Sequence, residues 1–173
     1  MNEYIIVGII ILFVAVYIYS YYWYPPTVSI LQTRPYEFKP DMLLERQPIV
    51  IENNASSLED LHSAFFKLNP TEEFKLAGSD TWHGNPFKYV AIQLQAPGEI
   101  LLSPASTRMI ADTDHATDAE DVMIPDPTDS NLLAIRAQAG EIILIPFHWH
   151  YLITDKLKVK CLGIHDYVTY FLP

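Results

Sequence analysis

The chain has 173 residues, a formal net charge of −10 and a composition in which half of the residues are hydrophobic. This acidic balance argues against binding to a phosphate backbone, because such binding draws its affinity from clustered lysine and arginine. We therefore expect no nucleic-acid partner. Cys161 is the only cysteine, which excludes an intrachain disulfide, and its apolar, strand-like surroundings predict a buried, inert thiol.

The first element is an uncharged and almost wholly apolar run over residues 4–24, YIIVGIIILFVAVYIYSYYWY. As a helix rising about 1.5 Å per residue, it is long enough for the roughly 30 Å hydrocarbon core of a bilayer. The aromatic rings near its end favour the headgroup layer, and the two prolines that follow stop the helix. We expect residues 1–26 to form a single-pass transmembrane anchor. Six residues mark this anchor: Tyr4, Ile11, Phe13, Tyr17, Trp23 and Tyr24.

The alternative for this run is a cleavable signal peptide, which needs a basic start, a shorter apolar core and a small-residue cleavage site. The chain instead begins Met-Asn-Glu and leaves the run through tyrosines, which favours an uncleaved anchor. The nearby cations, Arg34, Lys39 and Arg46, follow the run, and this bias favours a C-terminal domain on the cytosolic side. Asn54 begins a glycosylation sequon that would be used only if the domain were lumenal.

The remainder of the chain is long enough for one compact domain. Residues 27–47 are extended and then spaced by prolines, which predicts a stalk, and residues 48–173 are expected to form the β domain. Residues 48–52 are β-branched and predict a strand. Ser56 and Glu59 match a capping box, and apolar residues then recur every three or four positions, which predicts one short helix over residues 57–68.

The later segments are strand-like, and their short, regular spacing with turn signals predicts a sandwich or a small barrel. The expected strands cover residues 87–95, 99–103, 132–138, 141–146, 151–154, 158–163 and 167–172. Between them, residues 104–131 form an acidic excursion that is too long for an ordinary hairpin. It is either a cation or partner site or a solvated loop, and no glycine falls at the turn position of a calcium loop.

Two stretches of the chain match each other: residues 95–104, QAPGEILLSP, and residues 137–146, AQAGEIILIP. Each carries Gly-Glu-Ile-x-Leu-x-Pro after a predicted strand. We interpret each as a hairpin with a tight turn, in which the glycine takes a positive φ and an alternating strand ends at proline. Repeated hairpins of this kind fit a jelly roll of paired antiparallel strands, and chance similarity is the alternative.

The second copy and its continuation, residues 139–151 (AGEIILIPFHWHY), resemble the cupin-like, JmjC-type pattern. In that family the resemblance implies a double-stranded β-helix that holds Fe(II) by a His-x-Asp/Glu pair and a distal histidine, with 2-oxoglutarate as cosubstrate. This chain departs from the pattern at the metal. Tyr151 stands where the distal histidine is expected, and His83 is followed by Gly84 and Asn85, so that an amide replaces the carboxylate.

Other candidate ligands and nucleophiles are incomplete. His148 and His150 are two apart and could share a metal on one strand face, but a third ligand is missing nearby. His165 and Asp166 are adjacent and would point to opposite faces, while His115 and Asp118 of the acidic segment lack a chelating strand spacing. Neither Gly-x-Ser-x-Gly nor a Cys-His pairing is present. We therefore expect no catalytic residue, no metal and no cofactor.

The wider pattern combines the apolar anchor with residues 43–52 (LLERQPIVIE), residues 144–149 (LIPFHW) and residues 163–167 (GIHDY). It is similar to small membrane-anchored cupin-like virion proteins of nucleocytoplasmic large DNA viruses, which have a degenerate JmjC-type jelly roll. The resemblance implies a mainly β fold: a single jelly-roll, or double-stranded β-helix, domain with one short helix, preceded by the transmembrane helix.

For function, the resemblance implies a structural minor capsid protein in the inner viral membrane, which derives from the host endoplasmic reticulum. The expected partners are the lipid bilayer and the major and minor capsid proteins, with the C-terminal domain on the capsid side. The candidate interface residues are Trp82, Phe147, Trp149 and Tyr151. The alternative is a membrane-tethered Fe(II)/2-oxoglutarate oxygenase in which His83, His148 or His150 contributes.

Overall fold

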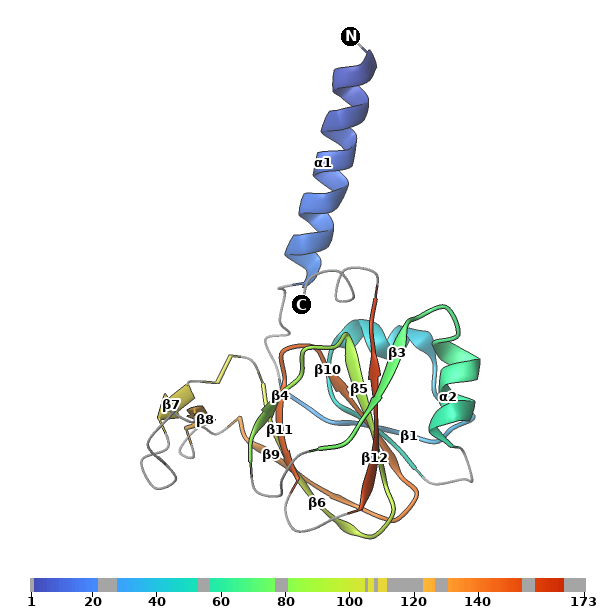
Figure 1. Cartoon of the computed structure of the whole chain (residues 1–173), viewed down its shortest axis with the longest axis vertical. Helices are drawn as coiled ribbons and strands as arrows, with labels where there is room; N and C mark the ends of the chain where they lie inside the picture. Colours follow the sequence, from blue (N-terminus) through green and yellow to red (C-terminus); the bar gives the residue numbers. More distant parts are fainter. Residues whose placement is uncertain are drawn as a thin grey trace.

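The computed structural model describes residues 2–21, 28–52, 57–76, 81–104, 106–107, 109–111, 123–126, 131–153 and 158–166. Over these residues the chain is mainly β, consistent with a β-sandwich, and its helices are α1 (Asn2–Tyr21), α2 (Leu58–Phe65) and the short 3-10 helix η1 (Pro40–Glu45). Figure 1 shows α1 projecting away from the β domain.

Helix α1 has twenty residues and covers most of the apolar run. Each side chain from Tyr4 to Tyr19 is exposed, including those of Ile11, Phe13 and Tyr17. The anchor markers Trp23 and Tyr24 lie outside the described residues. Within the part of the chain that the structure describes, no helix is long and apolar enough to cross a membrane.

One sheet has six strands, in the order β1, β2, β10, β5, β12, β3. Their bounds are β1 (Leu31–Thr33), β2 (Ile49–Ile51), β10 (Ile142–Pro146), β5 (Tyr89–Leu94), β12 (Val159–Ile164) and β3 (Thr71–Phe74). Strand β1 runs parallel to β2, and the other neighbours are antiparallel. The central strands β10 and β5 are continuous runs of mainly apolar residues because both faces of this sheet are covered.

The second sheet has four antiparallel strands, in the order β4, β11, β6, β9. Their bounds are β4 (His83–Gly84), β11 (His150–Ile153), β6 (Gly98–Ser103) and β9 (Leu133–Ala137). A separate two-stranded ribbon, β7 (Met109–Ala111) with β8 (Met123–Pro125), stands within the acidic excursion. Most of this excursion lies outside the described residues, as does the strand expected over residues 167–172.

Two apolar clusters result from the alternation of side chains along the strands. The first lies between the two sheets and combines side chains such as Val90 and Ile92 with Leu102 and Tyr151 of the opposite sheet. The second lies on the outer face of the six-stranded sheet, where α2 and the segment of η1 cover residues such as Leu144. The six-stranded sheet is therefore the middle layer of the domain.

The stalk expected over residues 27–47 is wrong. Within this stretch β1 joins the six-stranded sheet beside β2, Phe38 packs edge-on against Phe65 with ring centroids 4.7 Å apart, and Gln47 is buried. The prolines that suggested a spacer instead shape the turn and the 3-10 helix, which begins at Pro40. The β domain therefore includes most of the residues expected to form the stalk.

The predicted short helix is confirmed in its position but is shorter than expected. Its N-cap is Ser57, and the capping box is completed by Asp60, one residue later at each position than Ser56 and Glu59. The Ser57 hydroxyl accepts from the Asp60 N–H at 3.1 Å, and the Asp60 carboxylate accepts from the Ser57 N–H at 3.0 Å. Both pairs fit the same sequence rule, which is why the rule misplaced the cap by one residue.

The two matching stretches are not hairpins, which corrects the sequence interpretation. Strand β5 belongs to the six-stranded sheet and β6 to the four-stranded sheet, and β9 and β10 are divided in the same way. Each glycine turn therefore carries the chain from one sheet to the other. Gly140 has the expected positive φ of 87°, whereas Gly98 does not and already belongs to β6.

Candidate functional site

The first candidate site is inside the domain, where β4 lies beside β11. Their register places Tyr151 opposite His83, and the two rings lie 5.6 Å apart between centroids. Two residues beyond His83, Asn85 is buried. The structure thus brings together the three positions that the cupin-like resemblance assigns to metal ligands, and they hold a histidine, an amide and a phenol.

Asn85 has a structural role that uses its whole side chain. Its amide nitrogen donates to the carbonyl oxygens of Ile145 at 2.8 Å and Pro146 at 2.7 Å, and its amide oxygen accepts from the Phe87 N–H at 2.9 Å. These bonds tie the turn before β5 to the end of β10. The amide is therefore not free to face a metal, and it could not replace the negative charge of a carboxylate ligand.

We predict that Asn85→Asp destabilises the domain by about 2 kcal/mol, because a carboxylate cannot donate to two buried carbonyl groups. The midpoint of urea-induced unfolding of the full chain in detergent checks this. Asn69→Asp is a partial control, since the Asn69 amide also donates to a carbonyl, that of His165 at 2.7 Å, but in a half-buried setting. Equal stability of wild type and Asn85→Asp would contradict the structural role.

The histidines after β10 do not share a strand face, which corrects the spacing argument. His148 lies in the turn before β11 with a φ of 64°, and only His150 belongs to the strand. Because Tyr151 points into the core between the sheets, its neighbour His150 points to the other face. The two imidazoles are nonetheless close enough for their charges to interact.

Burial favours the neutral forms of these imidazoles. It lowers the pKa of His83 and His150, and it lowers the pKa of His148 together with the nearby charges of His150 and Arg46. Neutral imidazoles can bind metals, but within the described ranges no group of three or more His, Cys, Asp or Glu side chains could hold a metal ion. The three histidines supply nitrogen ligands, but among the described residues no carboxylate completes a metal site with them.

Cys161 and Tyr151 are both buried in the cluster between the sheets. Burial raises the pKa of the Cys161 thiol to about 12, so the thiolate that a nucleophile needs is not formed at neutral pH. Burial also raises the pKa of Tyr151, and the neighbouring Cys161 adds to this effect. The predicted buried thiol is thus confirmed, and neither group is placed for nucleophilic chemistry.

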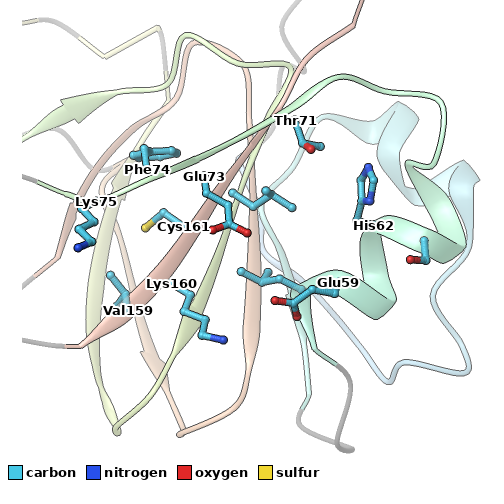
Figure 2. A pocket seen from close by; sticks show the side chains of 12 residues that line it. Glu59, His62, Thr71, Glu73, Phe74, Lys75, Val159, Lys160 and Cys161 are labelled. Atoms are coloured by element: carbon cyan, nitrogen blue, oxygen red, sulfur yellow. The ribbon is translucent and has the colours of Figure 1, made fainter.

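The second candidate site is a surface pocket between α2 and the edge of the six-stranded sheet, with a volume of about 420 Å³. Figure 2 shows side chains from α2, β3 and β12 converging on it. Its lining combines apolar and charged groups: Leu58, Glu59, His62, Ser63, Thr71, Glu73, Phe74, Lys75, Val159, Lys160, Cys161 and Leu162.

The electrostatics of this pocket are mixed in sign. Glu59 lies near Lys160, and backbone and Ser57 hydrogen bonds together with this cation lower the pKa of the Glu59 carboxyl. The His62 Nε2 atom is shielded from solvent and has no hydrogen-bond partner among the described residues. Such a lining suits a polypeptide segment that offers charges of both signs beside an apolar side chain. Sequence reasoning missed this pocket because its residues come from three separated elements.

The structure divides the four predicted interface residues into two pairs. Trp149 and Tyr151 are each only 2% exposed and belong to the core, so they cannot be interface anchors, which corrects that prediction. Trp82 and Phe147 are half-buried and remain candidates. Phe147 and Trp149 follow the end of β10, where sequence alone does not distinguish a core residue from a surface anchor.

No protein-family model, curated protein or solved structure matches this chain.

Proposed function

We propose that this protein is a structural, non-catalytic minor capsid protein of a large DNA virus, anchored in the inner viral membrane and connecting it to the icosahedral capsid shell. The observation that carries the proposal is α1, an apolar helix whose side chains from Tyr4 to Tyr19 are exposed on every side. In water such a surface would be strongly unfavourable, and a bilayer is the environment in which it is stable.

The anchor in this proposal is the whole apolar run of the sequence. The described helix ends at Tyr21, and the run continues with Tyr22, Trp23 and Tyr24, whose rings suit the headgroup layer. A helix over the complete run of residues 4–24 would be about 30 Å long, which matches the hydrocarbon core of a bilayer.

The pairing order of the strands supports the jelly roll in this proposal. We take β3, β4, β5, β6, β9, β10, β11 and β12 as its eight strands. When these strands are numbered one to eight in chain order, four neighbouring strands of the six-stranded sheet have the order one, eight, three, six. The four-stranded sheet has the order two, seven, four, five. This order is the one expected for a jelly roll and supports that fold, with β1 and β2 added at one edge and the β7–β8 ribbon inserted after the fourth strand.

The same jelly roll could carry an oxygenase, and the inward-facing pair of His83 and Tyr151 is the observation that favours this second candidate. The chemistry of the residues argues against it. A 2-oxoglutarate oxygenase needs two histidines and a carboxylate around Fe(II), whereas here the corresponding positions hold His83, a hydrogen-bonded Asn85 and a buried phenol. We therefore prefer the structural function.

The pocket between α2 and β3 is our candidate contact for a shell protein. It is lined by the first part of β12, from Val159 to Leu162, whereas the residues after the other end of that strand approach α1 through Asp166. The pocket therefore lies along the side of the domain, away from the anchor. Its two lysines, Lys75 and Lys160, give chemical access to this contact.

Lysine-directed cross-linking of intact virus particles, followed by mass spectrometry, tests the proposal. We expect links from Lys75 and Lys160 to major or minor capsid proteins. Lys88, which lies 3.8 Å from Asp166 beside the anchor, is the matched control and should give few such links. Absence of the protein from particles would overturn the proposal, and turnover of 2-oxoglutarate by the purified chain with added Fe(II) would establish the oxygenase instead.

A further inference from the structure

The structure shows which end of the β domain lies next to α1. The Tyr17 hydroxyl donates to the Asp166 carboxylate at 2.5 Å, and the ammonium of Lys88 lies 3.8 Å from the same oxygen. Asp166 follows the end of β12 and Lys88 precedes β5, so the contact is made at one end of the six-stranded sheet. We call this the anchor-side end, and it comprises η1, residues 66–70, Lys88 and Asp166.

Two surface segments are tied to this end by hydrogen bonds. The Tyr89 hydroxyl donates to the Leu43 carbonyl at 2.8 Å, which holds η1 beside the start of β5. The Asn69 amide donates to the His165 carbonyl at 2.7 Å, and the His165 N–H donates to the Pro70 carbonyl at 2.9 Å. In Figure 1 the short helix before β2 and the α2–β3 connection both lie at the end from which α1 projects.

Each of these segments exposes a leucine. Outside α1, the exposed large hydrophobic side chains of the described residues are Tyr36, Leu44 and Leu68. Leu44 of η1 is 76% exposed and Leu68 after α2 is 83% exposed, and both belong to the anchor-side end. Moving a leucine side chain from water into an apolar layer is favourable, because its apolar surface leaves water.

The charge of this end also differs from that of the whole chain. The chain carries a net charge of −10, whereas cations and acids at the anchor-side end are close to balance. The cations are Lys67 and Lys88, and the acids are Asp41, Glu45 and Asp166. The general repulsion between an acidic protein and an anionic lipid surface is therefore weak here.

Geometry keeps this end close to the bilayer. Tyr17 belongs to the anchor run of residues 4–24, which ends seven residues later. The Tyr17–Asp166 bond therefore holds the anchor-side end of the domain against the membrane-exit end of the anchor. The chain from Tyr21 to Val28 can extend at most about 25 Å, which leaves no room for a distant domain.

We propose that Leu44 and Leu68 insert into the boundary between headgroups and acyl chains of the same bilayer that α1 enters. The inference rests on the membrane anchor of the proposed function and adds a second contact surface to it. The domain then rests on the lipid at three places, namely α1, η1 and the α2–β3 connection, which fixes its tilt. Its pocket between α2 and β3 consequently faces sideways, along the membrane plane.

Spin labels on the full chain in phosphatidylcholine vesicles test this inference. Leu44→Cys and Leu68→Cys each place a nitroxide at an exposed position, and the buried Cys161, whose thiol pKa is raised to about 12, does not compete for the reagent. Tyr36→Cys is the matched control. The Tyr36 hydroxyl accepts a hydrogen bond from Arg34, whose guanidinium also donates to Glu52, the residue after β2. Ile51 pairs with Ile142 at the start of β10, whereas the anchor-side end lies at Pro146, the other end of that strand. Tyr36 is therefore at the opposite end of the sheet from Leu44 and Leu68.

We expect the labels at positions 44 and 68 to be relaxed strongly by oxygen and at least several-fold less by an aqueous nickel chelate than the label at position 36. If the chain floats with vesicles but all three labels are equally accessible to the chelate, the inference is overturned while the anchor stands. If the chain does not float with vesicles, the anchor itself is overturned, and the inference with it.

Discussion

Replacing Trp149 with alanine should lower the free energy of unfolding of the β domain by about 3–5 kcal/mol, the usual cost of removing a large aromatic side chain from a packed core. Trp149 is 2% exposed and belongs to the cluster between the two sheets. Its removal leaves a cavity that the surrounding strands cannot fill. The midpoint of urea-induced unfolding, followed by circular dichroism on the full chain in detergent, measures this loss.

Trp82→Ala is the control for that experiment, because Trp82 is the same residue type in a half-buried position before β4. We expect it to cost about 1 kcal/mol or less, in line with substitutions outside packed cores. Equal effects of the two substitutions would contradict the assignment of Trp149 to the core. Reduced cross-linking to capsid proteins in Trp82→Ala, with unchanged stability, would in turn support Trp82 as an interface residue.

Phe13→Asp should prevent stable membrane integration of α1. A carboxylate near the centre of a membrane-spanning helix costs about 2.5–3.5 kcal/mol on insertion scales, which is a change of about 100-fold in the insertion equilibrium. Phe13 lies near the middle of α1 and is 72% exposed, so the substitution disturbs no contact within the β domain. The fraction of protein that resists alkaline extraction from membranes measures the effect.

Tyr4→Asp is the matched control, since Tyr4 is also exposed but lies near the start of α1, where a charge can reach the headgroups. We expect a much smaller loss of membrane-bound protein from this variant. If Phe13→Asp and wild type remain in the membrane fraction equally, α1 does not span the bilayer. The comparison separates spanning from simple surface binding, because a surface helix would respond similarly at both positions.

The sequence predicted the central strands well because burial on both faces leaves a clear apolar pattern. Strands β5 and β10 are buried along nearly their whole length, and short runs of apolar, β-branched residues of this kind predict buried strands. Strand β3, by contrast, reads Thr-Glu-Glu-Phe and lies at an edge of the sheet. Its stability comes from pairing with β12, a contact far away in sequence that no local pattern reveals.

The candidate site inside the domain was only partly predictable. The sequence resemblance to cupin-like proteins placed Tyr151 and Asn85 at the positions expected for a distal histidine and a carboxylate, and the pairing of β4 with β11 brings these positions together. The backbone of His148 could not be foreseen, because a positive φ is uncommon for a residue with a side chain. That conformation removes His148 from the strand and separates it from the face of His150.

The glycine turns were interpreted as hairpins because a local motif shows where a chain turns, but not which strand it meets next. Gly140 takes the conformation that such a turn requires. The strand that follows each turn joins the opposite sheet, so that β5 pairs with β10 and β6 pairs with β9. Sheet membership depends on tertiary packing, which the repeated heptapeptide does not contain.

The pairing of β12 with both β3 and β5 has a consequence for biosynthesis. A fold dominated by contacts between distant parts of the chain has a high contact order and closes slowly. Strand β3 cannot acquire its neighbour until β12 has left the ribosome, whereas α1 emerges earlier than both strands. If α1 enters the bilayer as proposed, the domain completes its folding while already tethered, which keeps its unpaired strand edges at the membrane surface and away from other nascent chains.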